Sequence, residues 1–211
     1  MNRAAVGVAQ VAVALGSVVY YPRWTGSLES SHPDALARAV FMLGTLTFTV
    51  LSISVPTQIH TTKLHALAFS VSATILGAAF FHVVIVFFGA PVFQMCWKTF
   101  LLAALVSILA VPQATMQFHS AYNGVTPWID LLLNARYRDQ TDVQMAWTCI
   151  GTLLGAYIGT IFIPLDWDRP WQQWPLPCVY GAVYGHVAGI GLSLFATWCG
   201  VVPLLVDTKH E

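Results

Sequence analysis

The residues most able to do chemistry in this chain are two aspartates and an arginine, Asp166, Asp168 and Arg169, which surround and follow Trp167. In an extended turn, side chains two positions apart face the same way, so the two carboxylates could hold a divalent ion together with a phosphate. The adjacent guanidinium offers a competing arrangement, because it can neutralise the carboxylates while they cap the following turn. We expect the second arrangement, and therefore no metal at this position.

Histidines and cysteines give no pattern typical of a metal or catalytic site. His60 and His65 are five residues apart, so they point to different faces of a helix. His82 and His186 fall inside apolar segments, where a neutral imidazole can form a hydrogen bond with a neighbouring helix, and we expect both to be packing residues. The cysteines are Cys96, Cys149, Cys178 and Cys199. None forms a Cys-x-x-Cys pair, so we predict no catalytic residue, no metal and no cofactor.

Two apolar segments flank the aspartates, and each carries glycine at every fourth position. These glycines are Gly151, Gly155 and Gly159 before the turn, and Gly181, Gly185 and Gly189 after it. Four-residue spacing places small residues along one helix face, where two backbones can approach closely within lipid. The spacing therefore predicts a packed helical hairpin.

The turn of this hairpin, residues 163–177, is rich in tryptophan and proline. Tryptophan favours the bilayer interface, where its apolar ring and its N–H donor can both be satisfied, and proline stops a helix from continuing. We expect the turn to lie at the membrane edge and to contact a partner or a lipid. The residues of this predicted contact are Asp166, Trp167, Asp168, Arg169, Pro170, Trp171 and Trp174.

Composition indicates a membrane protein. Hydrophobic residues make up 57% of the 211 residues and charged residues only 9%, against roughly a quarter in a typical soluble domain. Such a chain lacks the polar surface that keeps a soluble protein dispersed. The formal net charge is zero, which removes the electrostatic basis for binding nucleic acid.

The chain is expected to form one polytopic membrane domain over residues 1–211, an all-α bundle of about six transmembrane helices, because about 20 apolar residues cross the hydrocarbon core. The predicted spans are residues 4–20, 36–55, 67–88, 93–111, 143–163 and 179–206. The first ends in the interface aromatics Tyr20 and Tyr21, which favours a membrane helix over a cleaved signal peptide. No Asp or Glu falls within any of these spans. The loop charges favour both termini in the cytoplasm only weakly.

The longest polar connection, from about residue 112 to residue 142, is too short for a folded domain. Trp128 and the apolar patch at 129–133 could form a short amphipathic helix on the membrane surface. A solvated connector is an equally good interpretation.

Two sequence motifs resemble the phosphatidylinositol-glycan biosynthesis class F family. The first is Phe-His-Val-Val-Ile-Val-Phe-Phe-Gly-Ala-Pro at 81–91, followed by Thr-Phe-Leu at 99–101. The second is Ile-Pro-Leu-Asp-Trp-Asp-Arg-Pro-Trp-Gln-Gln-Trp-Pro at 163–175, which is long and rich in rare residues. The resemblance covers roughly residues 80–206, and the first two spans and the connector resemble the family only in hydropathy and position.

The resemblance implies a small multi-pass subunit in the endoplasmic reticulum membrane. Members of this family bind and stabilise the large ethanolamine-phosphate transferases that modify the glycosylphosphatidylinositol (GPI) anchor precursor, and they are not thought to carry the chemistry. The implied partners are thus a transferase catalytic subunit and membrane lipids. An alternative is a lipid-handling protein or a weak phosphotransferase, which would use Asp166, Asp168 and Arg169 on a phosphate headgroup.

Overall fold

A computed structural model of the chain describes residues 3–54, 63–91, 93–118, 126–165 and 167–201. Within these ranges every regular element is a helix, which confirms the predicted all-α fold class. In chain order they are α1 (Arg3–Leu15), the π-helical η1 (Gly16–Tyr20), α2 (Tyr21–Thr25), α3 (Asp34–Ser54), α4 (Lys63–Phe87), α5 (Cys96–Ala110), α6 (Pro112–Phe118), α7 (Thr126–Leu132), α8 (Gln140–Thr160), the 3-10 helix η2 (Pro170–Gln172) and α9 (Leu176–Trp198).

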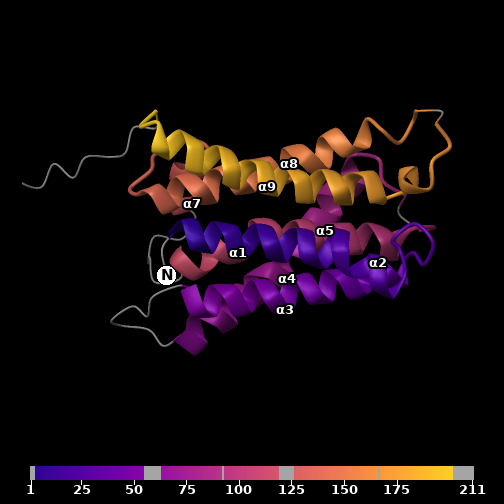
Figure 1. Cartoon of the computed structure of the whole chain (residues 1–211), viewed down its shortest axis with the longest axis horizontal. Coiled ribbons are helices and arrows are strands. Elements are labelled where there is room, and N and C mark those ends of the chain that lie inside the picture. Colours follow the sequence, from indigo (N-terminus) through magenta and orange to yellow (C-terminus); the bar gives the residue numbers. More distant parts are fainter. Residues whose placement is uncertain (1–2, 55–62, 92, 119–125, 166, 202–211) are drawn as a thin grey trace, which may run out of the picture.

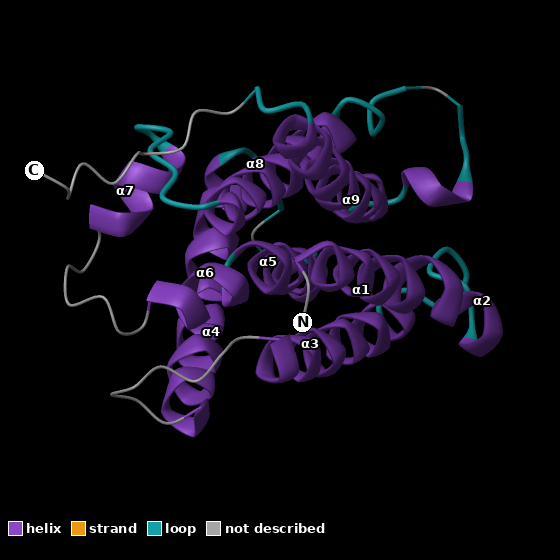
Figure 2. Cartoon of the chain, turned by 60° about the vertical axis from the view of Figure 1, so that its left-hand side comes forward, coloured by secondary structure: helices purple, strands orange, loops and turns teal. Residues whose placement is uncertain are grey.

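The helices pack into an elongated bundle with α5 near its centre (Figure 1). On one side α8 and α9 form an antiparallel hairpin, and on the other side α1 packs beside α3 (Figure 2). α5 contacts both sides, and its leucines are buried in the shared core. Fully or almost fully buried members of this core are Leu36 and Leu43 of α3, Leu101, Leu102 and Leu105 of α5, and Val179 and Val183 of α9.

Two turns far apart in the sequence meet at one end of the bundle, on the right in Figure 1. One is the loop at residues 26–33 between α2 and α3, and the other is the turn at 161–175 between α8 and α9. Gln173 Nε2 donates a hydrogen bond to the Glu29 carbonyl oxygen across them, at 3.4 Å. This end of the bundle therefore carries the aromatic turn that the sequence singles out.

Four helical segments in the described part of the chain are long and apolar enough to cross a membrane: Ala4–Thr25, Asp34–Ser54, Lys63–Phe87 and Leu176–Trp198. α5 has only 15 residues, roughly 22 Å of helix against a hydrocarbon core of about 30 Å. It ends before Pro112, which has no N–H to continue the hydrogen-bond ladder. α8 has 21 residues but is more polar. The count of six spans and the single domain over 1–211 stay predictions.

α8 is polar because it directs polar side chains into the bundle. Gln144, Thr148 and Thr152 are buried. The hydroxyl groups of Thr148 and Thr152 donate to backbone carbonyls one turn earlier, at 2.8 and 2.7 Å, which satisfies them without water. Gln144 Nε2 donates to Gln10 Oε1 of α1 at 3.1 Å. These groups join α8 to its neighbours in the interior of the bundle.

The start of α8 holds a buried carboxylate, Asp142, one residue before the predicted span at 143–163. Helix α8 begins three residues before the predicted span, because Asp139 caps it. Asp139 Oδ1 accepts the backbone N–H groups of Thr141 at 2.7 Å and Asp142 at 2.9 Å. The cap brings Asp142 into the first turn, where its side chain is only 2% exposed and pairs with Arg138 Nε at 3.1 Å.

Replacing Arg138 with alanine is expected to destabilise the protein by about 1 to 2 kcal/mol, because the buried Asp142 carboxylate loses its charged partner. Arg136 is the matched control. It is 63% exposed and 3.9 Å from Asp130, so its replacement by alanine is expected to change stability by less than about 0.5 kcal/mol. Thermal unfolding of both variants in detergent measures the difference, and equal shifts in Tm would contradict a structural role for the Arg138 pair.

The connector between α6 and α8 contains α7, whose inner face packs on the start of α8. Leu131 is buried and Trp128 packs against the same cluster, which includes Val143 and Met145. On the outer face Leu133, just beyond the helix, is 79% exposed. The described part of this connector therefore includes a short helix whose apolar side packs on the bundle, and its position on the membrane surface stays a prediction. Residues 119–125 lie outside the described ranges.

Candidate functional site

α8 and α9 meet along the two rows of glycines. A Cβ atom built at Gly155 would collide with the Gly181 carbonyl oxygen and would lie 3.0 Å from Gly185 Cα. A Cβ atom at Gly185 would collide with the Gly151 carbonyl oxygen in the same way. Gly159 and Gly189 likewise face backbone atoms of the opposite helix. The backbones of α8 and α9 are therefore in direct contact, with no side chain between them. This contact holds the two helices in a fixed relative position, and so also the turn that joins them.

The turn itself is organised by Gln172, which is only 9% exposed. Its Nε2 donates to the carbonyl oxygens of Phe162 at 2.9 Å and Leu165 at 2.8 Å. Its Oε1 accepts the backbone N–H of Arg169 at 2.9 Å. One amide side chain therefore ties the segment after α8 to the start of η2 through three hydrogen bonds to backbone groups.

The tryptophans of the turn fall into two groups. Trp167 and Trp171 form an aromatic cluster with Phe162, in which the ring centroids are 6.1 to 6.4 Å apart. Trp167 is 53% exposed, so its ring is open to lipid or to a partner. Trp174 instead turns inward, where its Nε1 donates to Thr99 Oγ1 at the start of α5, at 3.1 Å. Trp174 therefore fastens the turn to the bundle.

The expected neutralisation of the aspartates by Arg169 is wrong for Asp168. Both side chains are exposed, and no ion pair joins them in the part of the chain that the structure describes. The backbone of Asp168 is left-handed (φ 47°), a conformation that aspartate tolerates better than most residues. The turn therefore holds its shape through Gln172 and the backbone, since it lacks this charge pair. Asp166 lies outside the described residues, and Pro170 begins η2.

The intramembrane histidines join neighbouring helices. His186 is 4% exposed, and its Nδ1 lies 3.1 Å from Thr152 Oγ1 of α8. His82 places its ring edge-to-face against Phe100 of α5, with 6.0 Å between ring centroids. Among the described residues all four cysteines are free, and no group of three His, Cys, Asp or Glu side chains could hold a metal ion. His60 lies outside the described ranges.

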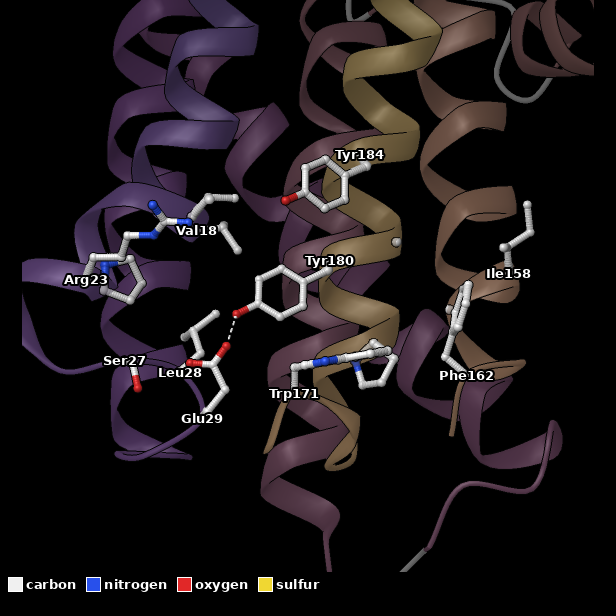
Figure 3. Close-up of a pocket in the computed structure, with 15 residues that line it drawn as sticks. Val18, Arg23, Ser27, Leu28, Glu29, Ile158, Phe162, Trp171, Tyr180 and Tyr184 are labelled. Carbon is white, nitrogen blue, oxygen red and sulfur yellow. Dashed lines mark hydrogen bonds between the residues drawn. The ribbon is translucent and has the colours of Figure 1, made fainter. Parts of the chain in front are cut away.

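A cavity of about 450 Å³ lies between η1, α2 and the α8–α9 hairpin, at the end of the bundle that carries the turn (Figure 3). Its walls are mainly apolar. They include Val18 of η1, Ile158 of α8, and Phe162 and Trp171 of the turn. Among the described residues of the predicted partner or lipid contact, Trp171 alone lines this cavity.

The mouth of the cavity carries charges that the sequence did not single out. Glu29 accepts a hydrogen bond from the Tyr180 hydroxyl of α9 at 2.8 Å. The Arg23 guanidinium lies 5.7 Å from the Tyr20 ring centroid, and no carboxylate pairs with it within the described residues. His32 lies in the same loop as Glu29, at residues 26–33. Burial and the nearby charge of Lys98 lower the pKa of His32 to about 4, so its imidazole is neutral at pH 7.

These charged residues are separated from the hairpin by about 150 positions, which explains why their proximity to it is not visible in the sequence. The sequence near Arg23 does contain one local indication of a headgroup contact. Arg23 stands in the last turn of the first span, beside the interface aromatics Tyr20 and Trp24, where a membrane protein can contact headgroups.

The family model of the GPI biosynthesis protein family Pig-F matches residues 11–194. The chain belongs to this family. The match begins well before residue 80, so family membership extends over the first two helical spans, where we expected only a likeness in hydropathy. It also includes the glycine hairpin, Gln172 and both sides of the cavity.

Individual curated proteins that are similar to the chain also carry names from GPI-anchor biosynthesis. The chain is 33% identical over 119 residues to the human "GPI ethanolamine phosphate transferase, stabilizing subunit", which covers 56% of this chain and 53% of the relative. It is 39% identical over 140 residues to the Yarrowia lipolytica "Glycosylphosphatidylinositol anchor biosynthesis protein 11", which covers 61% of this chain and 60% of the relative. The chain thus spans little more than half the length of these curated relatives. No solved structure matches it significantly.

Proposed function

We propose that this chain is a non-catalytic, multi-pass membrane subunit that binds and stabilises a large GPI ethanolamine-phosphate transferase in the endoplasmic reticulum membrane. Membership of the Pig-F family over residues 11–194 carries this proposal, together with the name of the human relative. The chemistry of the described residues supports it. They offer no metal-binding cluster, and the intramembrane histidines serve helix packing.

The surface of the bundle also supports a partner within the membrane. α4 is the least buried of the spanning helices, and large apolar side chains cover its outer face. Those at least 60% exposed are Leu64, Ile75, Leu76, Phe80 and Phe87. We propose that the transferase's membrane helices have two surfaces to engage, this face and the turn around Trp167, Asp168, Arg169, Pro170, Trp171 and Trp174.

The alternative function, a phosphotransferase that uses Asp166, Asp168 and Arg169, finds no support in the described residues. Asp168 and Arg169 are exposed, and neither lines the cavity. A phosphotransferase would need these groups gathered around a shielded substrate, because catalytic electrostatics are strong only where water is excluded.

Copurification tests the proposal. The tagged chain is expressed together with a GPI ethanolamine-phosphate transferase in cells that lack their own Pig-F family protein. We expect the transferase to copurify with the chain, its steady-state level to rise, and GPI-anchored protein to return to the cell surface. Transfer of ethanolamine phosphate by the purified chain alone would overturn the non-catalytic assignment, and failure to copurify with any such transferase would overturn the partner.

A further inference from the structure

The cavity between α2 and the α8–α9 hairpin has the form of a site for an amphipathic ligand. At about 450 Å³ it has the size of a small-molecule site, and its walls are mainly apolar. Val18, Ile158 and Phe162 line them, and all three come from helices of the bundle or from the end of one (Figure 3). An aliphatic chain fits such walls, whereas a free ion or a sugar would be desolvated there without compensation.

The mouth of this cavity holds one charge of each sign. Arg23 supplies a guanidinium and Glu29 a carboxylate, and no ion pair joins the two within the described residues. Tyr180 fixes one carboxylate oxygen of Glu29 through its 2.8 Å hydrogen bond and leaves the other oxygen without a protein partner there. Figure 3 shows Arg23 and Glu29 at the same side of Tyr180 and Tyr184. Each charge is therefore free to meet an opposite charge on a ligand.

The position of these charges relative to the membrane indicates which ligands can reach the cavity. The first spanning segment ends at Thr25, two residues after Arg23, so the guanidinium stands at the edge of the membrane. Exposed aromatic side chains surround this end of the bundle: Tyr20 is 55%, Trp24 88% and Trp167 53% exposed. Tyrosine and tryptophan gather at the level of the headgroups, so the cavity opens where phospholipid headgroups lie.

We propose that this cavity binds one glycerophospholipid with a zwitterionic headgroup. Arg23 holds the phosphate through charge-assisted hydrogen bonds, Glu29 receives the headgroup ammonium, and an acyl chain lies along Val18, Ile158 and Phe162. Glu29 disfavours anionic phospholipids such as phosphatidylglycerol, whose headgroup brings a phosphate without an ammonium. The inference concerns the chain by itself, so it does not depend on which transferase it binds or on whether it binds one.

Native mass spectrometry of the delipidated chain in detergent tests this proposal. The protein is titrated separately with phosphatidylethanolamine, phosphatidylcholine and phosphatidylglycerol that carry the same acyl chains. We expect one tightly bound molecule of either zwitterionic lipid, with a Kd at least about 10-fold below that of phosphatidylglycerol. Equal Kd values for all three lipids, or several equivalent bound molecules, would overturn the proposal.

Two pairs of variants locate the site. Arg23→Gln and Glu29→Gln are expected to raise the Kd for the zwitterionic lipids about 10-fold each. Arg38→Gln and Asp34→Asn remove the same charges from exposed positions near the start of α3, beside the loop at 26–33 but outside the cavity, and are expected to change the Kd less than about 2-fold. Glu29→Gln keeps an acceptor for Tyr180, and an unchanged Tm shows that each variant folds. Equal effects of cavity and control variants would assign the binding to general surface charge.

Discussion

Replacing Gly155 or Gly185 with leucine is expected to prevent folding or to destabilise the bundle by at least about 3 kcal/mol. The Cβ atom alone would collide with a backbone carbonyl oxygen of the opposite helix, Gly181 for the first and Gly151 for the second. Backbone cannot move aside as a flexible side chain can, so the two helices would have to separate. Protein level in membranes, the monodisperse fraction in detergent and Tm measure the loss.

Gly191 is the matched control for these glycines. It stands in the same helix, α9, but a Cβ atom there would meet nothing within 4 Å, and the residue is exposed. Gly191→Leu is therefore expected to leave level and Tm nearly unchanged, or to raise Tm slightly because leucine favours the helix. If the loss in Gly155→Leu equalled that in Gly191→Leu, direct backbone contact would not be what holds the hairpin together.

Replacing Gln172 with leucine is expected to destabilise the turn by roughly 3 kcal/mol. Leucine fills a similar volume but leaves the Phe162 carbonyl and the Arg169 N–H without this partner, while the Leu165 carbonyl keeps only its bond from the Trp167 N–H. Each buried unpaired group costs about 1 to 3 kcal/mol, less where water reaches it. Loss of the bonds to the Phe162 and Leu165 carbonyls would release η2 and with it the Trp167–Trp171 cluster. A fall in Tm, together with faster proteolysis within residues 163–175, measures this effect.

The neighbouring glutamine provides the control, since Gln173 is exposed and makes one long hydrogen bond, at 3.4 Å to the Glu29 carbonyl oxygen. Gln173→Leu is expected to change stability by less than about 0.5 kcal/mol. Gln172→Glu is a second test, because its carboxylate keeps an acceptor for the Arg169 N–H but loses both donated bonds. We expect it to be at least as destabilising as leucine. A harmless Gln172→Glu would show that the donated bonds do not hold the turn.

Much of the fold could be predicted from local sequence. Long apolar stretches bounded by proline or polar residues fixed where helices run, because a buried backbone in lipid must satisfy its own hydrogen bonds. The four-residue spacing of Gly151, Gly155 and Gly159 indicated a close-packed face, since helix geometry alone puts residues four apart on one side. Helix start points were less visible. The predicted fifth span began at residue 143, and the Asp139 cap moved its start to Gln140.

Tertiary structure decided the partners of the polar groups. Asp168 and Arg169 are adjacent in the sequence, which indicated a charge pair. In the structure Asp168 has a left-handed backbone, and both side chains are exposed and form no ion pair with each other. The hydrogen bonds of Gln172 hold the turn instead. Asp142 is buried at the start of α8, where Arg138 is its charged partner.

The cavity depended on tertiary structure most of all. Glu29 and Tyr180 are 151 positions apart, and only the packing of α1 against α9 and the meeting of the two turns bring them within 2.8 Å. Hydropathy and periodicity act through neighbours along the chain, so they determine which segments enter the membrane and which helix face is small or polar. Which polar groups then share one cavity is set by how whole helices pack, a property of contacts between segments that local sequence does not contain.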